Sequence, residues 1–178
     1  MLNSGFIKCL FLILFASICL DSVFAQTDVN RGFAVSIGDI VNDAPLHFQN
    51  GDSLMLSDYL GKVVVLQFTA SWCSVCRKEM PHLENEVWLP YKNKDFVLIG
   101  VDIDKDVSKI APFIEDMEVT YPIAIDNDQS LFYNFAEKGA GVTRNIVIDQ
   151  KGKIVFLTRL FDPIEFQAMI NKIDELLP

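Results

Sequence analysis

Apolar residues in this chain gather in short runs that are separated by polar turns. Two of these runs, residues 63–68 (VVVLQF) and 95–102 (DFVLIGVD), contain few polar positions. Apolar runs of this length without alternation predict strands that are buried on both faces of a sheet. Three further strands are predicted at residues 121–126, 145–149 and 154–159, and the last two should pair antiparallel across a short polar turn.

Helical segments are predicted between and after these strands. The first runs from Ser74 to about Tyr91 and should be kinked at Pro81, which removes one helical hydrogen bond. Because a strand, a helix and a strand follow one another here, the first two strands should be parallel. Further helices are predicted at residues 104–117 and 129–136, and an amphipathic helix that Asp162 caps should end the chain.

The segment before the first long strand predicts an N-terminal extension made of a strand and a hairpin. Residues 34–37 predict a short strand. Residues 46–48 and 53–55 flank Asn50-Gly51-Asp52, a turn typical of hairpins. Residues 57–60 then predict one helical turn, which Gly61 ends.

Residues 1–25 have the pattern of a secretory signal. Lys8 supplies the positive charge, and residues 9–20 form an apolar run that is too short to span a membrane comfortably. Ala25 provides a small residue before cleavage at Gln26. The predicted organisation is therefore a signal peptide at 1–25, a linker at 26–36 and one domain at 37–178.

Two other readings of this N-terminal segment stay open. In the first, the protein is a lipoprotein whose Cys19 is acylated after cleavage, although Ile18 is a poor residue at the position before it. In the second, the segment is retained as an anchor. Soluble export is the favoured reading, and membrane contact is expected only through the signal or a lipid anchor.

Composition and charge narrow the function classes. The chain has 178 residues, of which 51% are hydrophobic, enough for one domain with a sizeable core. Its net charge of −9 and the lack of a basic stripe argue against nucleic acid as a partner. His47 and His82 are interpreted as surface residues. Residues 126–128 (DND) are interpreted as a capping turn, because an EF-hand loop would need a glycine and a distal glutamate.

Cys73 and Cys76 carry the candidate chemistry. Cys73 should lie at a helix N-terminus, where free backbone N–H groups and the helix dipole favour a thiolate. The spacing puts Cys76 on the same helix face, close enough to form a disulfide or to resolve a mixed one. A purely structural disulfide is the alternative, but so short a loop constrains the unfolded chain little.

Several segments together resemble the thioredoxin superfamily, and in particular its secreted TlpA-like branch. The motif WCSVCRKEMP at residues 72–81 follows a strand, residues 56–62 (LSDYLGK) lead into that strand, and residues 145–149 (NIVID) come later in the same order. The resemblance extends from Ile37 to the C-terminus. It implies an α/β thioredoxin-like fold with a mixed central sheet flanked by helices and an N-terminal strand or hairpin extension.

The resemblance also implies roles for single residues. Cys73 would be the nucleophile and Cys76 the resolving thiol. Glu79 would tune the acid–base chemistry of the pair, the alternative being a solvated carboxylate on the helix surface. Trp72 would pack beside the pair and line the substrate groove, which is compatible with simple core filling. Neither a cofactor nor a metal is expected.

Two positions depart from the family pattern. Gln67 stands where thioredoxins proper have a buried acidic residue, so Glu79 is the nearby group that can exchange protons. Thr143 stands where the family places a cis-proline in the loop facing the cysteines. A cis bond before a non-proline residue costs about 2.5–4 kcal/mol, so the Val142–Thr143 bond should be trans. We expect Val142 and Thr143 to line the substrate groove with altered selectivity.

The sequence thus predicts an exported thiol–disulfide oxidoreductase, located in a bacterial periplasm, whose partners are protein thiols or disulfides. The favoured direction is that of a reductant supplied by an upstream electron donor, and a disulfide-forming oxidant is the alternative. A module that binds Cu(I) through two thiolates is a second alternative. A peroxidase of the peroxiredoxin kind is disfavoured, since Thr69 stands four residues before Cys73 and the matching proline is missing.

Overall fold

The computed structural model describes residues 30–177, and residues 32–177 belong to one compact unit, to which the following description applies. Its centre is a five-stranded sheet in the order β5-β4-β3-β6-β7. The pairs β3–β4 and β4–β5 are parallel, whereas β3–β6 and β6–β7 are antiparallel. The mixed sheet expected from the sequence is therefore confirmed, with its strands at Val63–Thr69 (β3), Phe96–Asp102 (β4), Ile123–Ile125 (β5), Arg144–Ile148 (β6) and Ile154–Arg159 (β7).

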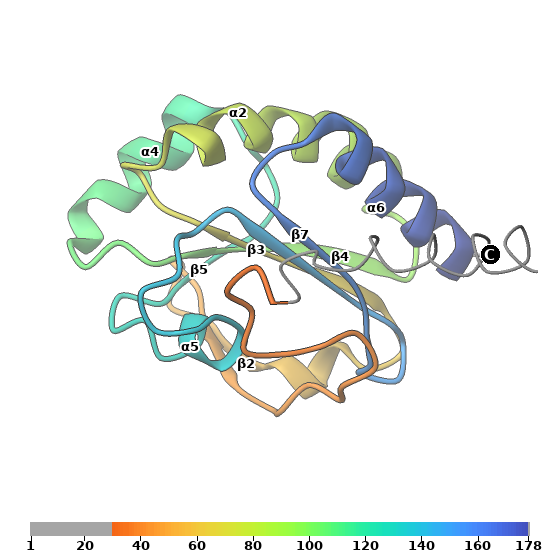
Figure 1. Cartoon of the computed structure of the whole chain (residues 1–178). Helices are drawn as coiled ribbons and strands as arrows, with labels where there is room; N and C mark the ends of the chain where they lie inside the picture. The colour runs from red at the N-terminus through yellow and green to blue at the C-terminus, as the bar shows by residue number, and fades with distance from the viewer. Residues whose placement is uncertain (1–29, 178) are drawn as a thin grey trace, which may run out of the picture. The chain divides into compact units, whose positions relative to one another are not determined.

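Helices cover both faces of the sheet. Helices α2, α4 and α6 lie along one face, and the short helix α5 lies on the other face with the N-terminal segments, so the fold has three layers (Figure 1). Their bounds are Ser74–His82 (α2), Ile110–Met117 (α4), Phe132–Phe135 (α5) and Pro163–Leu176 (α6). A 3-10 turn at Val107–Lys109 (η3) precedes α4.

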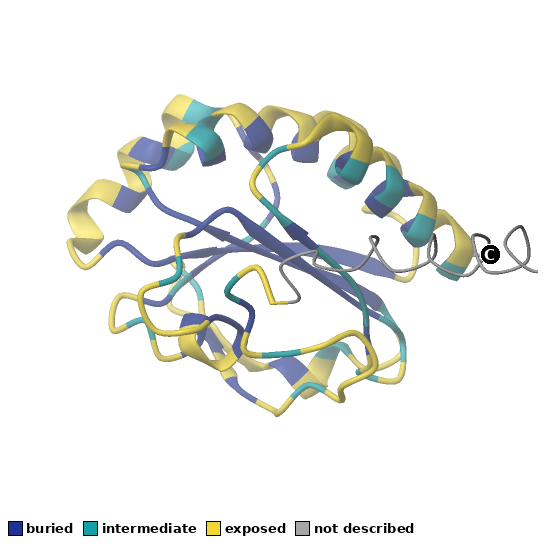
Figure 2. Ribbon diagram, viewed as in Figure 1, coloured by how far each residue is buried: buried dark blue, intermediate teal, exposed yellow. Residues whose placement is uncertain are grey.

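Strand β3 is buried along its whole length, as its unbroken apolar pattern predicts (Figure 2). Because successive side chains of a strand point to opposite faces, its residues divide between two hydrophobic clusters. Leu66 and Phe68 belong to the cluster that also contains Phe132 of α5, and Val65 belongs to the cluster with Met80 of α2. The strand that leads to the cysteines is thus held from both sides.

The helix predicted at residues 74–91 forms as three consecutive segments. Helix α2 contains Pro81, a π-helical stretch follows at Leu83–Trp88 (η2), and a last turn at Leu89–Tyr91 (α3) completes it. The change of helical type begins two residues after the proline, where the regular hydrogen-bond ladder is already interrupted.

Aspartate side chains start two of the helices, as the sequence predicts. Asp162 accepts hydrogen bonds from the N–H groups of Ile164 and Glu165 at the start of α6. The Asp126 carboxylate accepts from two backbone N–H groups before α5, at Leu131 and Phe132. The capping interpretation of residues 126–128 is confirmed, although α5 is shorter than the predicted helix.

The N-terminal extension contains the predicted hairpin, formed by Pro45–His47 (β1) and Ser53–Met55 (β2), and a 3-10 turn at Leu56–Tyr59 (η1). The predicted strand at residues 34–37 was wrong. The backbone turns there instead, with the Asp39 N–H bonded to the Ser36 carbonyl and Gly38 at φ +105°, and a strand cannot continue through such a turn. Phe33, within the predicted linker, is buried and forms a single bridge with Ala136.

The signal peptide predicted at residues 1–25 and the alternative lipid site at Cys19 lie outside the described residues, and both stay predictions. Of the helices within residues 30–177, none combines the length and the apolar character that a membrane crossing requires.

Candidate functional site

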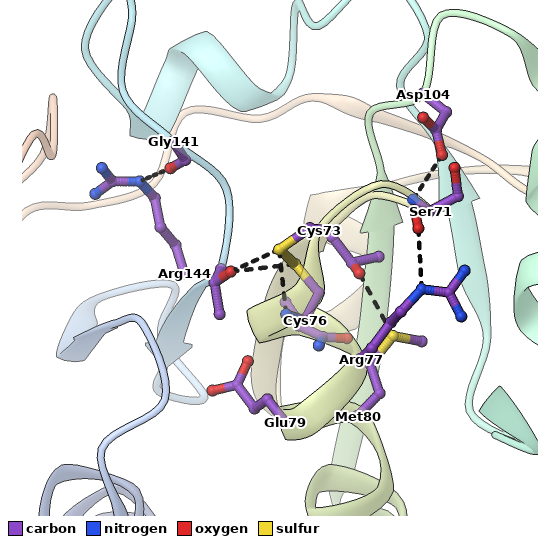
Figure 3. The surroundings of a disulfide bond; sticks show 12 residues. Ser71, Cys73, Cys76, Arg77, Glu79, Met80, Asp104, Gly141 and Arg144 are labelled. Carbon is purple, nitrogen blue, oxygen red and sulfur yellow. Dashed lines mark hydrogen bonds between the residues drawn. A yellow bond between two sulfur atoms is a disulfide. The ribbon is translucent and has the colours of Figure 1, made fainter.

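Cys73 and Cys76 form a disulfide at the point where the loop after β3 enters α2 (Figure 3). Cys73 is the N-cap of the helix, and its Sγ accepts a hydrogen bond of 3.1 Å from the backbone N–H of Cys76. Cys73 is 8% exposed and Cys76 is fully buried. The predicted position at a helix N-terminus is confirmed, and Cys73 is the slightly more exposed residue of the pair.

The loop that carries Cys73 is held by Asp104, which follows β4, and by Arg77 of α2. The Ser71 N–H donates to Asp104 Oδ2 at 2.7 Å, and Arg77 Nε donates to the Ser71 carbonyl at 3.1 Å (Figure 3). The Arg77 guanidinium also lies 4.9 Å from the centre of the Phe113 ring on α4. These contacts tie the loop to α2 and to the segment after β4, and they tie α2 to α4.

Thr143 comes from a different part of the chain and meets both cysteines. Its Oγ1 lies 3.0 Å from Cys73 Sγ and 3.1 Å from Cys76 Sγ. The Val142–Thr143 peptide bond is trans, as predicted, and Thr143 has a positive φ of 62°. The residue at the family's cis-proline position therefore faces the disulfide with a hydroxyl group.

The other residues expected in the substrate groove lie in contrasting environments. Trp72 is 64% exposed next to Cys73, so its interpretation as core filling was wrong. Val142 is buried and packs within the hydrophobic cluster on the α5 side of the sheet. The contribution of Trp72, Val142 and Thr143 to substrate binding stays a prediction.

Glu79 is buried beneath the cysteines, one turn further along α2, with 1% of its surface exposed (Figure 3). The alternative of a solvated carboxylate was therefore wrong. Its Oε1 accepts a hydrogen bond of 2.7 Å from Asn145 Nδ2. Burial raises the pKa of Glu79 to about 7, against the opposing effect of nearby Asn145 and Gln67. The group can therefore gain or lose a proton near neutral pH.

A row of polar side chains crosses the sheet under α2 and contains residues that sequence reasoning missed. Gln67 pairs in register with Asn145, which pairs with Thr158, so these residues share one face of the sheet. Asn145 Nδ2 also lies 2.8 Å from Thr158 Oγ1. From the other direction, the Tyr121 hydroxyl donates to Gln67 Oε1 at 2.9 Å.

Gly100 leaves room for the Tyr121 ring next to this row of polar side chains. An added Cβ at Gly100, the residue beside Gln67 in β4, would lie 3.2 Å from the Tyr121 ring and 2.3 Å from the side chain of Ile123. The sequence signal for Gln67 was a polar residue inside an otherwise apolar strand, whereas Asn145 stands at the start of its predicted strand and gives a weaker signal. Such residues need buried partners.

Three residues that the sequence analysis weighed as catalytic or ligand candidates bond to other side chains. The Thr69 hydroxyl donates a hydrogen bond to Met80 Sδ. His47 and His82 are exposed, as predicted, and bond to Ser53 and Glu86. Within residues 30–177, no three His, Cys, Asp or Glu side chains gather as a metal site would require.

This geometry agrees with a comparison against known families. Residues 37–157 match the model of the AhpC/TSA family, which is more than half of the chain. The chain belongs to the AhpC/TSA family. The expected membership of the thioredoxin superfamily and the thioredoxin-like fold are thereby confirmed.

Relatives of this AhpC/TSA family member include proteins named thiol-disulfide oxidoreductase ResA. The one from Bacillus thuringiensis is 34% identical over 106 residues, 59% of each chain, and the one from Geobacillus kaustophilus is 31% identical over 123 residues, 68% of each chain. The chain thus spans 59% of the length of the first of these relatives.

Two solved structures are also similar to this chain over most of its length. A Bacteroides thetaiotaomicron protein, provisionally assigned as a protein disulfide isomerase, is 46% identical with a TM-score of 0.79, over 82% of this chain and 92% of its own. A Chlorobium tepidum protein, provisionally assigned as the thiol:disulfide interchange protein DsbE, is 28% identical with a TM-score of 0.71, over 80% and 99% of the two chains.

Proposed function

We propose that this chain is a thiol–disulfide oxidoreductase that exchanges disulfides with protein partners through Cys73 and Cys76. The observation that carries the proposal is the disulfide across the first turn of α2, with the Cys76 N–H directed at Cys73 Sγ. A helix N-terminus stabilises a thiolate, which is the reactive form in exchange. The names of the relatives support the same reaction class.

In the favoured direction the reduced pair donates electrons to an oxidised partner. The Cys73 thiolate attacks one sulfur of the partner's disulfide, and the other sulfur leaves as a thiolate. Cys76 then attacks Cys73 Sγ, and the second partner sulfur leaves with the electron pair. The partner has gained two electrons, and the Cys73–Cys76 disulfide has formed.

Glu79 is the proposed proton acceptor in the second step. Cys76 must lose its proton before it attacks, and Glu79 follows it by one turn on α2. With a pKa raised by burial to about 7, Glu79 is partly ionised at neutral pH and is suited to general base catalysis. When the pair is reduced again, the same carboxyl can return a proton to Cys76.

The proposed setting is outside the cytoplasm, in a bacterial periplasm, after removal of residues 1–25. An upstream electron donor of unspecified identity would then keep the pair reduced. The finer assignment to the TlpA-like branch and the lipoprotein alternative belong to this proposal as well. They depend on the N-terminal sequence pattern and on motif residues 72–81.

The deciding experiment is the reduction potential of the pair in the purified protein, measured by equilibration with defined thiol buffers and combined with an insulin-disulfide reduction assay. A value near −270 mV, about that of thioredoxin, supports a reductant; a value near about −120 mV indicates an oxidant. The gap corresponds to roughly 7 kcal/mol for two electrons. A pair with no reversible couple would overturn the exchange reaction and leave a structural or Cu(I)-binding role.

Matched cysteine variants sharpen this experiment. Cys76→Ser should accumulate a mixed disulfide between Cys73 and a partner, because the resolving sulfur is missing. Cys73→Ser should form none, since Cys76 is fully buried. If both variants trapped partners equally, the assignment of nucleophile and resolving thiol would be wrong.

A further inference from the structure

The Thr143 hydroxyl lies beside the disulfide, at nearly the same distance from its two sulfurs. Its Oγ1 is 3.0 Å from Cys73 Sγ and 3.1 Å from Cys76 Sγ, and the residue is 1% exposed. Both distances are within hydrogen-bond range for sulfur. Since Thr143 precedes β6 and the cysteines begin α2, this contact joins the sheet to the helix terminus at the reacting atoms.

The backbone holds this hydroxyl in place. The Thr143 N–H donates to the Phe68 carbonyl at 3.2 Å, and its carbonyl accepts from the Leu160 N–H at 2.9 Å. Its φ of 62° is rare for a β-branched residue and costs roughly 1–3 kcal/mol, so surrounding contacts must enforce it. A side chain kept in a costly conformation next to reacting atoms suggests that its position matters for the reaction.

The two sulfurs differ in the other donors that they can use. Cys73 Sγ already accepts the Cys76 N–H at the helix terminus. For Cys76 Sγ, which is fully buried, Thr143 is the hydrogen-bond partner that the structure provides within residues 30–177. A thiolate that forms on Cys76 therefore depends on the hydroxyl more than one on Cys73 does.

The chemistry of exchange places negative charge on each sulfur in turn. When a dithiol reduces the pair, its first thiolate attacks Cys73 Sγ, the Cys73–Cys76 bond breaks, and the electron pair leaves on Cys76 Sγ. The second thiolate of the reductant then attacks its own bound sulfur, and that electron pair leaves on Cys73 Sγ. The reductant becomes a disulfide, and the pair gains two electrons.

We propose that Thr143 is a catalytic residue whose hydroxyl donates a hydrogen bond to whichever of the two sulfurs carries the charge, first Cys76 and then Cys73. A hydroxyl has one proton and rotates freely, so it can serve one sulfur at a time without transferring the proton. This proposal rests on the proposed function, and it assigns to the position of the family's cis-proline a direct part in bond breaking.

The test compares Thr143→Val, which keeps the branched shape and removes the hydroxyl, with Thr143→Ser, which keeps the hydroxyl. The probe is dithiothreitol, and the readouts are the rate of reduction of the disulfide in a single turnover and the ultraviolet titration of the thiolates of the reduced pair. A hydrogen bond to a charged group is worth about tenfold or more. Thr143→Val should be reduced about tenfold more slowly, and its thiolate titration should move up by about one pH unit.

Thr143→Ser should restore both readouts toward those of the parent. Equal behaviour of Thr143→Val and the parent would overturn the proposal, and so would a Thr143→Ser variant as slow as Thr143→Val, since shape alone would then explain the effect. If Thr143→Val does not fold by circular dichroism, Thr143→Ala replaces it in the same comparison. Both readouts use dithiothreitol and need no protein partner, so they decide the role of Thr143 even if insulin reduction and partner trapping fail.

Discussion

Asn145 on β6 donates a hydrogen bond of 2.7 Å to Glu79 on α2, and this contact joins the sheet to the helix that carries the cysteines. Both residues are fully or almost fully buried. The second oxygen of Glu79 and the Gln67 amide nitrogen fall short of hydrogen-bond geometry, although Gln67 lies close enough to lower the pKa of Glu79. Glu79 is therefore a carboxyl group whose ionisation is costly and whose main partner is one amide.

The first prediction is that Glu79 makes stability depend on pH. Its pKa is about 7 in the folded protein and 4.5 without burial, so between these values the folded state holds a proton that the unfolded chain releases. The free energy of unfolding should therefore fall as pH rises from 4.5 to 7, by roughly 3 kcal/mol from this group. Urea unfolding of Glu79→Gln should show a flatter profile over this range.

Asp102 provides the control for this measurement. Burial also raises its pKa to about 7, so it contributes a slope of the same sign. Asp102→Asn should remove a separate part of the slope, and the double variant should be flatter than either single one. An unchanged profile in Glu79→Gln would show that Glu79 ionises in the folded protein as it does in water.

A second prediction concerns the amide that contacts Glu79. Because the Asn145 bond lowers the pKa of Glu79, Asn145→Ala should raise that pKa further above 7, and Asn145→Asp should raise it still more through repulsion between like charges. The titration of Glu79 by carboxyl-carbon NMR would report the change. Thr158→Val is the matched control, since it removes the other partner of Asn145 Nδ2 and leaves the bond to Glu79 intact. A titration that does not move in Asn145→Ala would contradict the assignment.

The contacts of the polar row formed by Gln67, Asn145 and Thr158 could be predicted from the sequence only in part. The apolar run at 63–68 predicts β3, and the residues after Cys73 predict a helix, so the place of the disulfide follows from local pattern. Glu79 and Asn145 are 66 positions apart, and their meeting depends on the register of β3 against β6. Asn145 begins the strand predicted at 145–149, so its polarity alone does not indicate that it is buried or which partner it has.

The contact between Thr143 and the disulfide could also be predicted only in part from the sequence. The family pattern places residue 143 opposite the cysteines, and the cost of a cis bond predicts the trans form. The positive φ that directs the hydroxyl at both sulfurs comes from backbone bonds to Phe68 and Leu160, which are distant in sequence. A β-branched residue gives no sequence signal for that conformation, since its preferred regions have negative φ.

A third prediction is that the family's proline does not fit position 143 in this chain. Proline has φ near −65° and no N–H, so Thr143→Pro would lose the bond to the Phe68 carbonyl and conflict with the backbone. The variant should be less stable than the parent by more than about 1 kcal/mol in urea unfolding. Thr143→Gly is the control, because glycine adopts a positive φ without strain.

Thr143→Pro also tests the predicted substrate groove. If the proline variant is as stable as the parent, the loop can adopt another conformation. Exchange rates and partner choice must then be compared directly. Unchanged rates and unchanged partners in that variant would argue against a role of Val142 and Thr143 in selecting substrates.

The fourth prediction concerns the helix that closes the fold. Asp162 accepts two backbone N–H groups at the start of α6, at 3.0 Å from Ile164 and 2.9 Å from Glu165. Asp162→Ala should destabilise the protein by about 1 kcal/mol, the usual cost of losing an N-cap. Asp162→Asn keeps the cap and should cost less. Its cost relative to the parent measures the carboxylate's interaction with the helix dipole, and the further cost of Asp162→Ala measures the capping hydrogen bonds. The hydrogen bonds of the Asp162 carboxylate stay within the first turn of α6, so the reduction potential of the pair should be the same in both variants. A shifted potential would show that α6, whose Glu165 raises the pKa of Glu79, is coupled to the disulfide.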